Sequence, residues 1–288
     1  MTGRLTVLRT GPLALLQDTG RTGHAADGVG RSGAADRASA ARANALLGND
    51  SGAAVLECTL GGLQVRAETD LVVAVAGAPA PVEVDKEPVP HATRFDLRAG
   101  QTLRMRAPRT GLRTYLAVAG GFAVPAVLGS RSTDTLSGIG PPPVAAGDVL
   151  PVGASDEPPP STVPDAEIPA DGPVTLRVRF GPRDDWFTDP SALTTGEWTV
   201  SPRSNRVGLR LQRTDPDAPG LIRAVEGELP SEGMALGSVQ IPPGGEPVLF
   251  LADHPLTGGY PVVAVVLDAD VDRAAQLRPG QRLAFRAS

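Results

Sequence analysis

The sequence predicts a mainly β protein made of two related halves. Its 288 residues include 34 Gly and 29 Pro, which interrupt helices and favour short strands joined by turns. Alternation of apolar and polar residues opens the chain at residues 5–8 and recurs at residues 174–180, and both runs lead into a Gly-Pro turn. Aromatic residues make up only 3% of the chain, so Val, Leu and Ala must fill most of the core.

The individual strands follow from alternation or from short apolar runs. They are expected at residues 62–67, 71–76, 114–118, 247–251 and 262–267. A turn containing glycine, followed by a short alternating strand, recurs at residues 98–105, 146–152 and 278–285. These recurrences indicate an internal duplication. Residues 262–267 are apolar on both faces, which is typical of a strand in the middle of a sheet.

Helices are expected to be few and short. Residues 36–47 are rich in Ala and Leu and are followed by Gly48, the usual residue after a helix end. Small side chains make a narrow apolar stripe, so this helix is expected to pack closely on a sheet. Residues 154–172 are rich in Pro and acidic residues without an apolar period, which indicates a linker. The predicted domains are therefore residues 1–153 and 173–288.

Composition excludes several classes of function. The net charge is −5 and no basic tail is present, which argues against nucleic-acid binding. Lys86 is the only lysine, so the chain has neither a Walker A loop nor a lysine flanked by methionines that would carry covalent biotin. Because Lys86 lies between Asp and Glu, it is also a poor base for an amidase of the Ser-Ser-Lys type.

The expected location is cytoplasmic. A lone cysteine, Cys58, allows no internal disulfide and is expected to be a buried core thiol. No signal peptide and no apolar run of about 20 residues is visible, so no contact with a membrane is expected. His24 and His91 have no His or Cys at ligand spacing, and no metal site is predicted.

Polar residues beside glycines are concentrated in the first third of the chain. Loops of this kind are where sites are usually built, and these side chains are expected to converge around one cleft. The expected catalytic groups are Asp18, Asp36 and Glu57, and the expected binding groups are Gln17, Arg21, Ser32 and Asn44. Further along, Arg131, Ser132 and Thr133 place hydroxyls beside a guanidinium, a pattern that favours anion binding.

The second half contributes a further candidate segment at residues 253–260. Asp253 and Tyr260 are predicted to transfer protons, and Gly258 and Gly259 permit close approach of backbone to a ligand. The other residues predicted to bind substrate or an anion here are Ser231, Glu232, Gln240 and Thr257.

These motifs together resemble one family. Its members are described as the C subunit of 5-oxoprolinase, allophanate hydrolase subunit 2, KipA or biotin-dependent carboxyltransferase. The segments that carry the resemblance include residues 17–21, 28–36, 43–49, 115–121, 128–134, 181–187, 206–211, 231–233 and 258–261. The resemblance implies two cyclophilin-like β-barrel halves. It also implies a KipI-like partner, the B subunit of such complexes (allophanate hydrolase subunit 1), with a further A subunit.

The resemblance leaves three functions open. The first is ATP-dependent hydrolysis of the C–N amide bond of 5-oxoproline to give glutamate, with ATP and Mg²⁺ bound here or on a partner subunit. Arginines for phosphate and carboxylates for Mg²⁺ or proton transfer suit that reaction. The second is the carboxyltransferase half of a biotin-dependent urea or amide carboxylase. The third is a non-catalytic regulator of the KipA type that binds a KipI-like kinase inhibitor.

Overall fold

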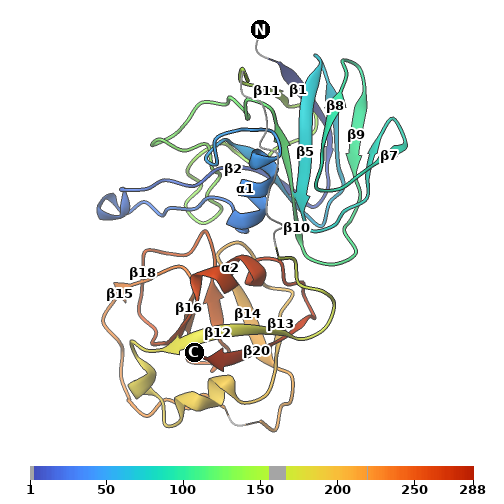
Figure 1. Ribbon diagram of the computed structural model, residues 1–288. Helices are drawn as coiled ribbons and strands as arrows, with labels where there is room; N and C mark the ends of the chain where they lie inside the picture. The colour runs from blue at the N-terminus through green and yellow to red at the C-terminus, as the bar shows by residue number, and fades with distance from the viewer. Residues whose placement is uncertain (1–2, 156–166, 219) are drawn as a thin grey trace. The chain divides into compact units, whose positions relative to one another are not determined.

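The computed structural model describes residues 3–155, 167–218 and 220–288. These residues form two compact units (Figure 1). The first unit is built from residues within 1–22 and 32–168, and the second from residues within 23–31 and 169–288. The short segment 23–31 thus belongs to the second unit, a feature that the predicted division of the chain does not contain. Most of the predicted linker, residues 156–166, lies outside the described residues.

The first unit contains two antiparallel sheets. One sheet runs in the order β11 (Val149–Pro151), β1 (Arg4–Thr10), β4 (Leu63–Ala67), β9 (Thr102–Met105), β6 (Val82–Val84) and β7 (Glu87–Val89). The other runs in the order β2 (Leu13–Gln17), β3 (Val55–Thr59), β10 (Arg113–Val118), β5 (Leu71–Gly77) and β8 (Arg94–Leu97).

A single apolar core joins these two sheets. Val65 of β4 and Leu103 of β9 belong to the same buried cluster as Leu56 of β3 and Val75 of β5. Because side chains alternate along a strand, the intervening residues point to the outer faces. Cys58 lies in this core, as predicted, and burial raises the pKa of its thiol well above the ordinary value.

Helix α1 (Arg37–Ala45) covers the outer face of the five-stranded sheet (Figure 1). Ala40 and Ala43 pack against Ala74, Ala76 and other residues of the sheet, so the predicted close approach of helix and sheet is confirmed. The helix begins after Asp36, whose carboxylate accepts the Ser39 N–H at 2.9 Å. It is shorter than the predicted 36–47 because the last residues before Gly48 form turns.

The second unit is a closed barrel. Its strands run in the order β12 (Val174–Phe180), β19 (Val262–Val266), β16 (Ser238–Gln240), β17 (Val248–Phe250), β14 (Gly208–Arg213), β13 (Trp198–Val200) and β20 (Arg282–Ala287). The parallel pairing of β20 with β12 closes it. Beside it lie the two-stranded sheet β15 (Glu232–Gly233) and β18 (Thr257–Gly258) and helix α2 (Asp268–Ala274).

The mainly β prediction is confirmed. The five strands expected from alternation or apolar runs match β4, β5, β10, β17 and β19 to within one residue at each end. The three turn-and-strand repeats match β9, β11 and β20. Strand β19 is central, between β12 and β16. Internal duplication stays a prediction, because β11 pairs antiparallel with β1 whereas β20 pairs parallel with β12.

Three short 3₁₀ helices and α2 were not predicted individually. The 3₁₀ segments are η1 (Ala25–Asp27), η2 (Asp184–Trp186) and η3 (Pro190–Thr194). Helix α2 is fixed by Asp270, whose carboxylate accepts the backbone N–H of Arg177 at 2.7 Å and its guanidinium Nε at 2.9 Å. A long-range contact of this kind gives no periodic signal in a seven-residue helix.

The close helix–sheet packing predicts a size limit at Ala43. This side chain is fully buried between α1 and the five-stranded sheet, so Ala43→Leu overpacks the layer and is expected to reduce the free energy of unfolding by about 1–3 kcal/mol. Ala38→Leu, at an exposed position of the same helix, is the control and should change stability little. Urea denaturation of both variants measures the effect, and equal stabilities would contradict the packing.

Candidate functional site

Asp18, just after β2, is the centre of a hydrogen-bond network with the loop at residues 130–132. Its carboxylate accepts the Ser130 and Ser132 hydroxyls, both at 2.6 Å. It also accepts the backbone N–H of Arg131 at 2.6 Å and that of Gly20 at 2.8 Å. Burial alone would raise the pKa of Asp18, but these four hydrogen bonds together hold the pKa below its ordinary value.

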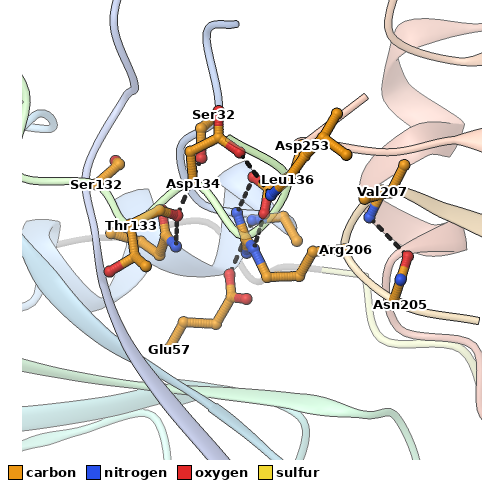
Figure 2. A network of polar contacts seen from close by, with 12 residues as sticks. Ser32, Glu57, Ser132, Thr133, Asp134, Leu136, Asn205, Arg206, Val207 and Asp253 are labelled. Carbon is orange, nitrogen blue, oxygen red and sulfur yellow. Dashed lines mark hydrogen bonds and ion pairs between the residues drawn. The ribbon is translucent and has the colours of Figure 1, made fainter. Parts of the chain in front are cut away.

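The neighbouring side chains converge on the carbonyls of Ser132 and Thr133. The Gln17 amide donates to the Thr133 carbonyl at 2.8 Å, and the Ser32 hydroxyl donates to the same oxygen at 3.1 Å (Figure 2). The buried guanidinium of Arg21 donates to the Ser132 carbonyl and to the Val127 carbonyl. Gln17, Arg21 and Ser32 therefore lie close together in space, while their convergence around one cleft stays a prediction.

Three buried atoms of this group have no hydrogen-bond partner among the described residues. They are Gln17 Oε1, Arg21 Nη1 and Thr133 Oγ1. A buried polar atom without a partner costs about 1–3 kcal/mol, so such atoms are usually kept for a reason. They comprise one acceptor, one donor and one hydroxyl that can act as either.

Glu57 forms a second buried cluster. Its carboxylate accepts the backbone N–H of Ala35 at 2.8 Å and the Tyr115 hydroxyl at 2.9 Å, and it lies 3.4 Å from Arg113 Nε. The Tyr115 hydroxyl in turn accepts the backbone N–H of Asp36 at 2.8 Å. Burial, followed by the charges of Glu57 and Asp36, raises the pKa of Tyr115 well above its ordinary value.

The two clusters share one face of the five-stranded sheet. Leu15 stands opposite Glu57, and Glu57 stands opposite Tyr115. Gln17 lies two residues beyond Leu15 on β2 and therefore points to the same side. That side is the face covered by α1, whereas the intervening residues of these strands enter the core.

Asn44 lies in a network of its own. Its side chain donates to the Ala53 carbonyl at 2.8 Å and accepts from the Asn49 amide at 3.0 Å. Asn49 also bonds the Val118 carbonyl and the Gly120 N–H, both at 2.8 Å. Asn44 therefore fixes the loop after α1, and the structure does not bring it into the Asp18 network.

The second unit brings most of its predicted site residues together. Strands β15 and β18 pair Glu232 with Gly258, and Glu232 forms an ion pair with Arg183. The Gln240 amide donates to the Tyr260 carbonyl at 3.0 Å. A Cβ at position 258 would lie 2.7 Å from Gln240 Nε2, so the Gln240 side chain packs directly against the backbone of Gly258. The other predicted members, Ser231, Thr257 and Gly259, are their sequence neighbours.

Asp253 is engaged in a buried ion pair. Its two carboxylate oxygens lie 2.9 Å from Nε and Nη2 of Arg206 (Figure 2), and both side chains are almost completely buried. Tyr260 is 44% exposed. The proton-transfer roles of Asp18, Asp36, Glu57, Asp253 and Tyr260 stay predictions. In the structure the four carboxylates each hold neighbouring groups in place.

Several residues that complete these networks are not predicted as site residues from the sequence. They are Arg113, Tyr115, Arg183 and Arg206. Arg113 and Tyr115 lie on the same face of β10, a strand whose six residues are all buried. An arginine and a tyrosine two residues apart on a strand point to the same side of the sheet. This spacing was the feature of the sequence that could have predicted a buried polar face.

Two further observations bear on metals and membranes. Within residues 3–155, 167–218 and 220–288, no group of three or more His, Cys, Asp or Glu side chains is placed to hold a metal ion. In the same part of the chain neither helix has the length and apolar character needed to cross a bilayer.

The Asp18 network predicts a pH-dependent contribution to stability. Because the pKa of Asp18 is lowered in the folded protein, its contribution is complete above the unfolded pKa of about 3.9. It is lost as the pH falls through the lower folded value. Asp18→Asn is expected to destabilise by about 1–3 kcal/mol at pH 7, and the difference from the natural chain should shrink towards pH 2.

Denaturant unfolding of the natural chain and Asp18→Asn, at neutral and acid pH, measures this effect. Asp96→Asn serves as the control, because Asp96 is exposed on β8. A destabilisation by Asp18→Asn that is equal at both pH values would contradict the assignment of the charge to this network.

Comparison with known proteins relates this chain to two kinds of enzyme. The C subunit of the 5-oxoprolinase of Escherichia coli K12 is 37% identical over 292 residues, which cover 98% of this chain and 90% of the relative. The putative urea carboxylase of Emericella nidulans is 31% identical over 304 residues, which cover 98% of this chain but only 24% of that protein.

Solved structures show the same fold. The protein TTHA0988 superposes with a TM-score of 0.87 at 38% identity, covering 99% of this chain and 55% of the other, so this chain spans about half its length. The urea amidolyase of K. lactis superposes with a TM-score of 0.88 at 29% identity, covering 98% of this chain and 18% of the other. The family described as carboxyltransferase domain, subdomain A and B, matches residues 27–287, and the chain belongs to this family.

Proposed function

We propose that this chain is the C subunit of a 5-oxoprolinase-type complex, which opens 5-oxoproline to glutamate by ATP-dependent hydrolysis of a C–N amide bond. The observation that carries the choice is the degree of sequence similarity. The chain is 37% and 35% identical to the C subunits of E. coli and Haemophilus influenzae, but 31% identical to the putative urea carboxylase and to the urea amidolyase of Saccharomyces cerevisiae.

The unpartnered atoms beside Asp18 support an amide substrate. An amide presents one carbonyl acceptor and one N–H donor side by side. Gln17 Oε1 accepts an N–H, and Arg21 Nη1 or Thr133 Oγ1 donates to a carbonyl. The side chains that carry these atoms all meet at the Ser132–Thr133 backbone, so the proposed amide site lies there.

The loop at residues 130–132 does not fit the phosphates of ATP. A phosphate group needs several free N–H and O–H donors. Here both serine hydroxyls and the Arg131 N–H already donate to Asp18. The proposed complex therefore holds ATP and any Mg²⁺ at a site other than this loop, on this chain or on the KipI-like B subunit or the A subunit, and the Asp18 network contributes to binding of the amide.

A second function remains supported by one specific observation. The superposition on the K. lactis urea amidolyase has a TM-score of 0.88 over 98% of this chain, and urea presents the same carbonyl and N–H groups as a lactam. The carboxyltransferase half of a biotin-dependent urea or amide carboxylase is thus the alternative, with biotin carried by a partner. A KipA-type regulator that binds a KipI-like inhibitor is the non-enzymatic alternative.

Reconstitution with the partner chains decides between these functions. This chain, co-expressed with homologues of the B and A subunits, is expected to form a stable complex with an interface above about 1,000 Å². The complex should convert 5-oxoproline to glutamate only when ATP is supplied. Carboxylation of urea with a biotinyl carrier protein would establish the alternative, and partner binding without either activity would favour the regulator.

Thr133→Val is the sharpest substitution for the proposed amide site. It removes a hydroxyl that makes no hydrogen bond among the described residues and keeps the side-chain shape, so the melting temperature should change little. Loss of one substrate hydrogen bond, at about 0.5–1.5 kcal/mol, should raise the KM for 5-oxoproline up to about tenfold. Thr188→Val, at an exposed position whose hydroxyl also makes no hydrogen bond among the described residues, is the matched control. An unchanged KM would remove Thr133 from the site.

A further inference from the structure

A concavity of about 340 Å³ lies on the six-stranded sheet, apart from the residues discussed above. Its lining residues are Gln64, Glu83, Asp85, Lys86, Thr102 and Arg104. Gln64, Arg104 and Glu83 stand opposite one another on β4, β9 and β6, so they form one row across three strands. Their strand neighbours Val65 and Leu103 enter the core, which places the row on the outer face. The volume is within the range of small-molecule sites.

The acidic groups of this concavity are already engaged. The Glu83 carboxylate accepts a hydrogen bond from Arg106 Nε at 2.6 Å. This hydrogen bond is the main cause of the lowered pKa of Glu83. Asp85 accepts the backbone N–H of Thr102 at 2.9 Å. In contrast, the Lys86 ammonium and the Arg104 guanidinium have no hydrogen bond or ion pair within the described part of the chain.

The only lysine of the protein is held here in an unfavourable backbone conformation. Asp85 and Lys86 form the two-residue turn between β6 and β7, with φ angles of 49° and 78°. Such turns favour Asn-Gly, because both central residues need positive φ. The Asp85 N–H also donates to the Thr102 carbonyl at 2.9 Å, so the turn is fixed against β9. A strained residue held in this way is a feature of functional sites.

We infer that this concavity binds a small molecule bearing a carboxylate or phosphate group, with the oxyanion held between Lys86 and Arg104. Lys86 and Arg104 are exposed and donate no hydrogen bond within the described residues, which leaves the concavity with donors for an anion. The charge of Arg104 also lowers the pKa of Glu83. The Gln64 amide and the Thr102 hydroxyl also make no side-chain hydrogen bond within the described residues, so they are available to the remainder of the ligand. This site is separate from the proposed amide site.

Calorimetric titration of the full-length chain tests the inference with two probes, inorganic phosphate and L-glutamate, against sodium chloride at equal ionic strength. At least one probe is expected to bind with a Kd of about 10 mM or tighter, a weak affinity suited to two charged contacts. Lys86→Gly and Arg104→Gln should each weaken binding at least tenfold. Arg94→Gln, at an exposed arginine of β8 on the other sheet, should leave it unchanged.

Lys86→Gly separates binding from folding. Glycine adopts positive φ without strain, so this variant should melt at or above the temperature of the natural chain while binding is lost. Preference for phosphate or glutamate identifies the source of the oxyanion. The inference is overturned when neither probe binds more tightly than chloride, or when Lys86→Gly and Arg104→Gln bind as tightly as Arg94→Gln. Neither result depends on the 5-oxoprolinase assay.

Discussion

The Asp18 carboxylate organises the polar side of the first unit. It accepts hydrogen bonds from Ser130, Arg131 and Ser132, three successive residues that lie more than 110 positions away in the chain. A loop of hydroxyls and backbone N–H groups is the kind of site that holds an anion, and here the anion is a side chain of the protein itself. Ser132 and Thr133 are thereby fixed where Gln17, Ser32 and Arg21 can reach their carbonyls.

The five-stranded sheet can carry buried polar side chains on its outer face because helix α1 packs closely on it and because those side chains are hydrogen-bonded. Small residues of α1 pack over Ala74 and Ala76, so backbone N–H groups preceding the helix come within reach of the strands. Glu57 accepts one of them, from Ala35, and Tyr115 accepts the next, from Asp36. A buried carboxylate is tolerated when it is paired and hydrogen-bonded, and Glu57 has both a guanidinium and two donors.

Local patterns in the sequence were sufficient for the strands but not for the roles of polar residues. Alternation depends only on neighbours, so β4, β5 and β19 could be predicted to within a residue. Whether a hydroxyl is free depends on what reaches it from elsewhere. Ser132 and Thr133 are adjacent and were both expected to bind an anion, yet the Ser132 hydroxyl donates to Asp18 while that of Thr133 has no partner among the described residues.

Residues whose polar atoms are all hydrogen-bonded within the protein therefore build the site, whereas residues with an unbonded polar atom are able to bind a substrate. Asp18, Glu57 and Asp253 are the chemically strongest groups, but each is occupied by two or more donors. A carboxylate held by several donors in its charged form is a weak proton acceptor, as the lowered pKa of Asp18 shows. In the proposed function, substrate recognition falls to weaker groups, Gln17 and Thr133, and Asp18 fixes the loop that leads into Thr133. Such a division fits a protein that positions an amide while groups elsewhere in the complex activate it.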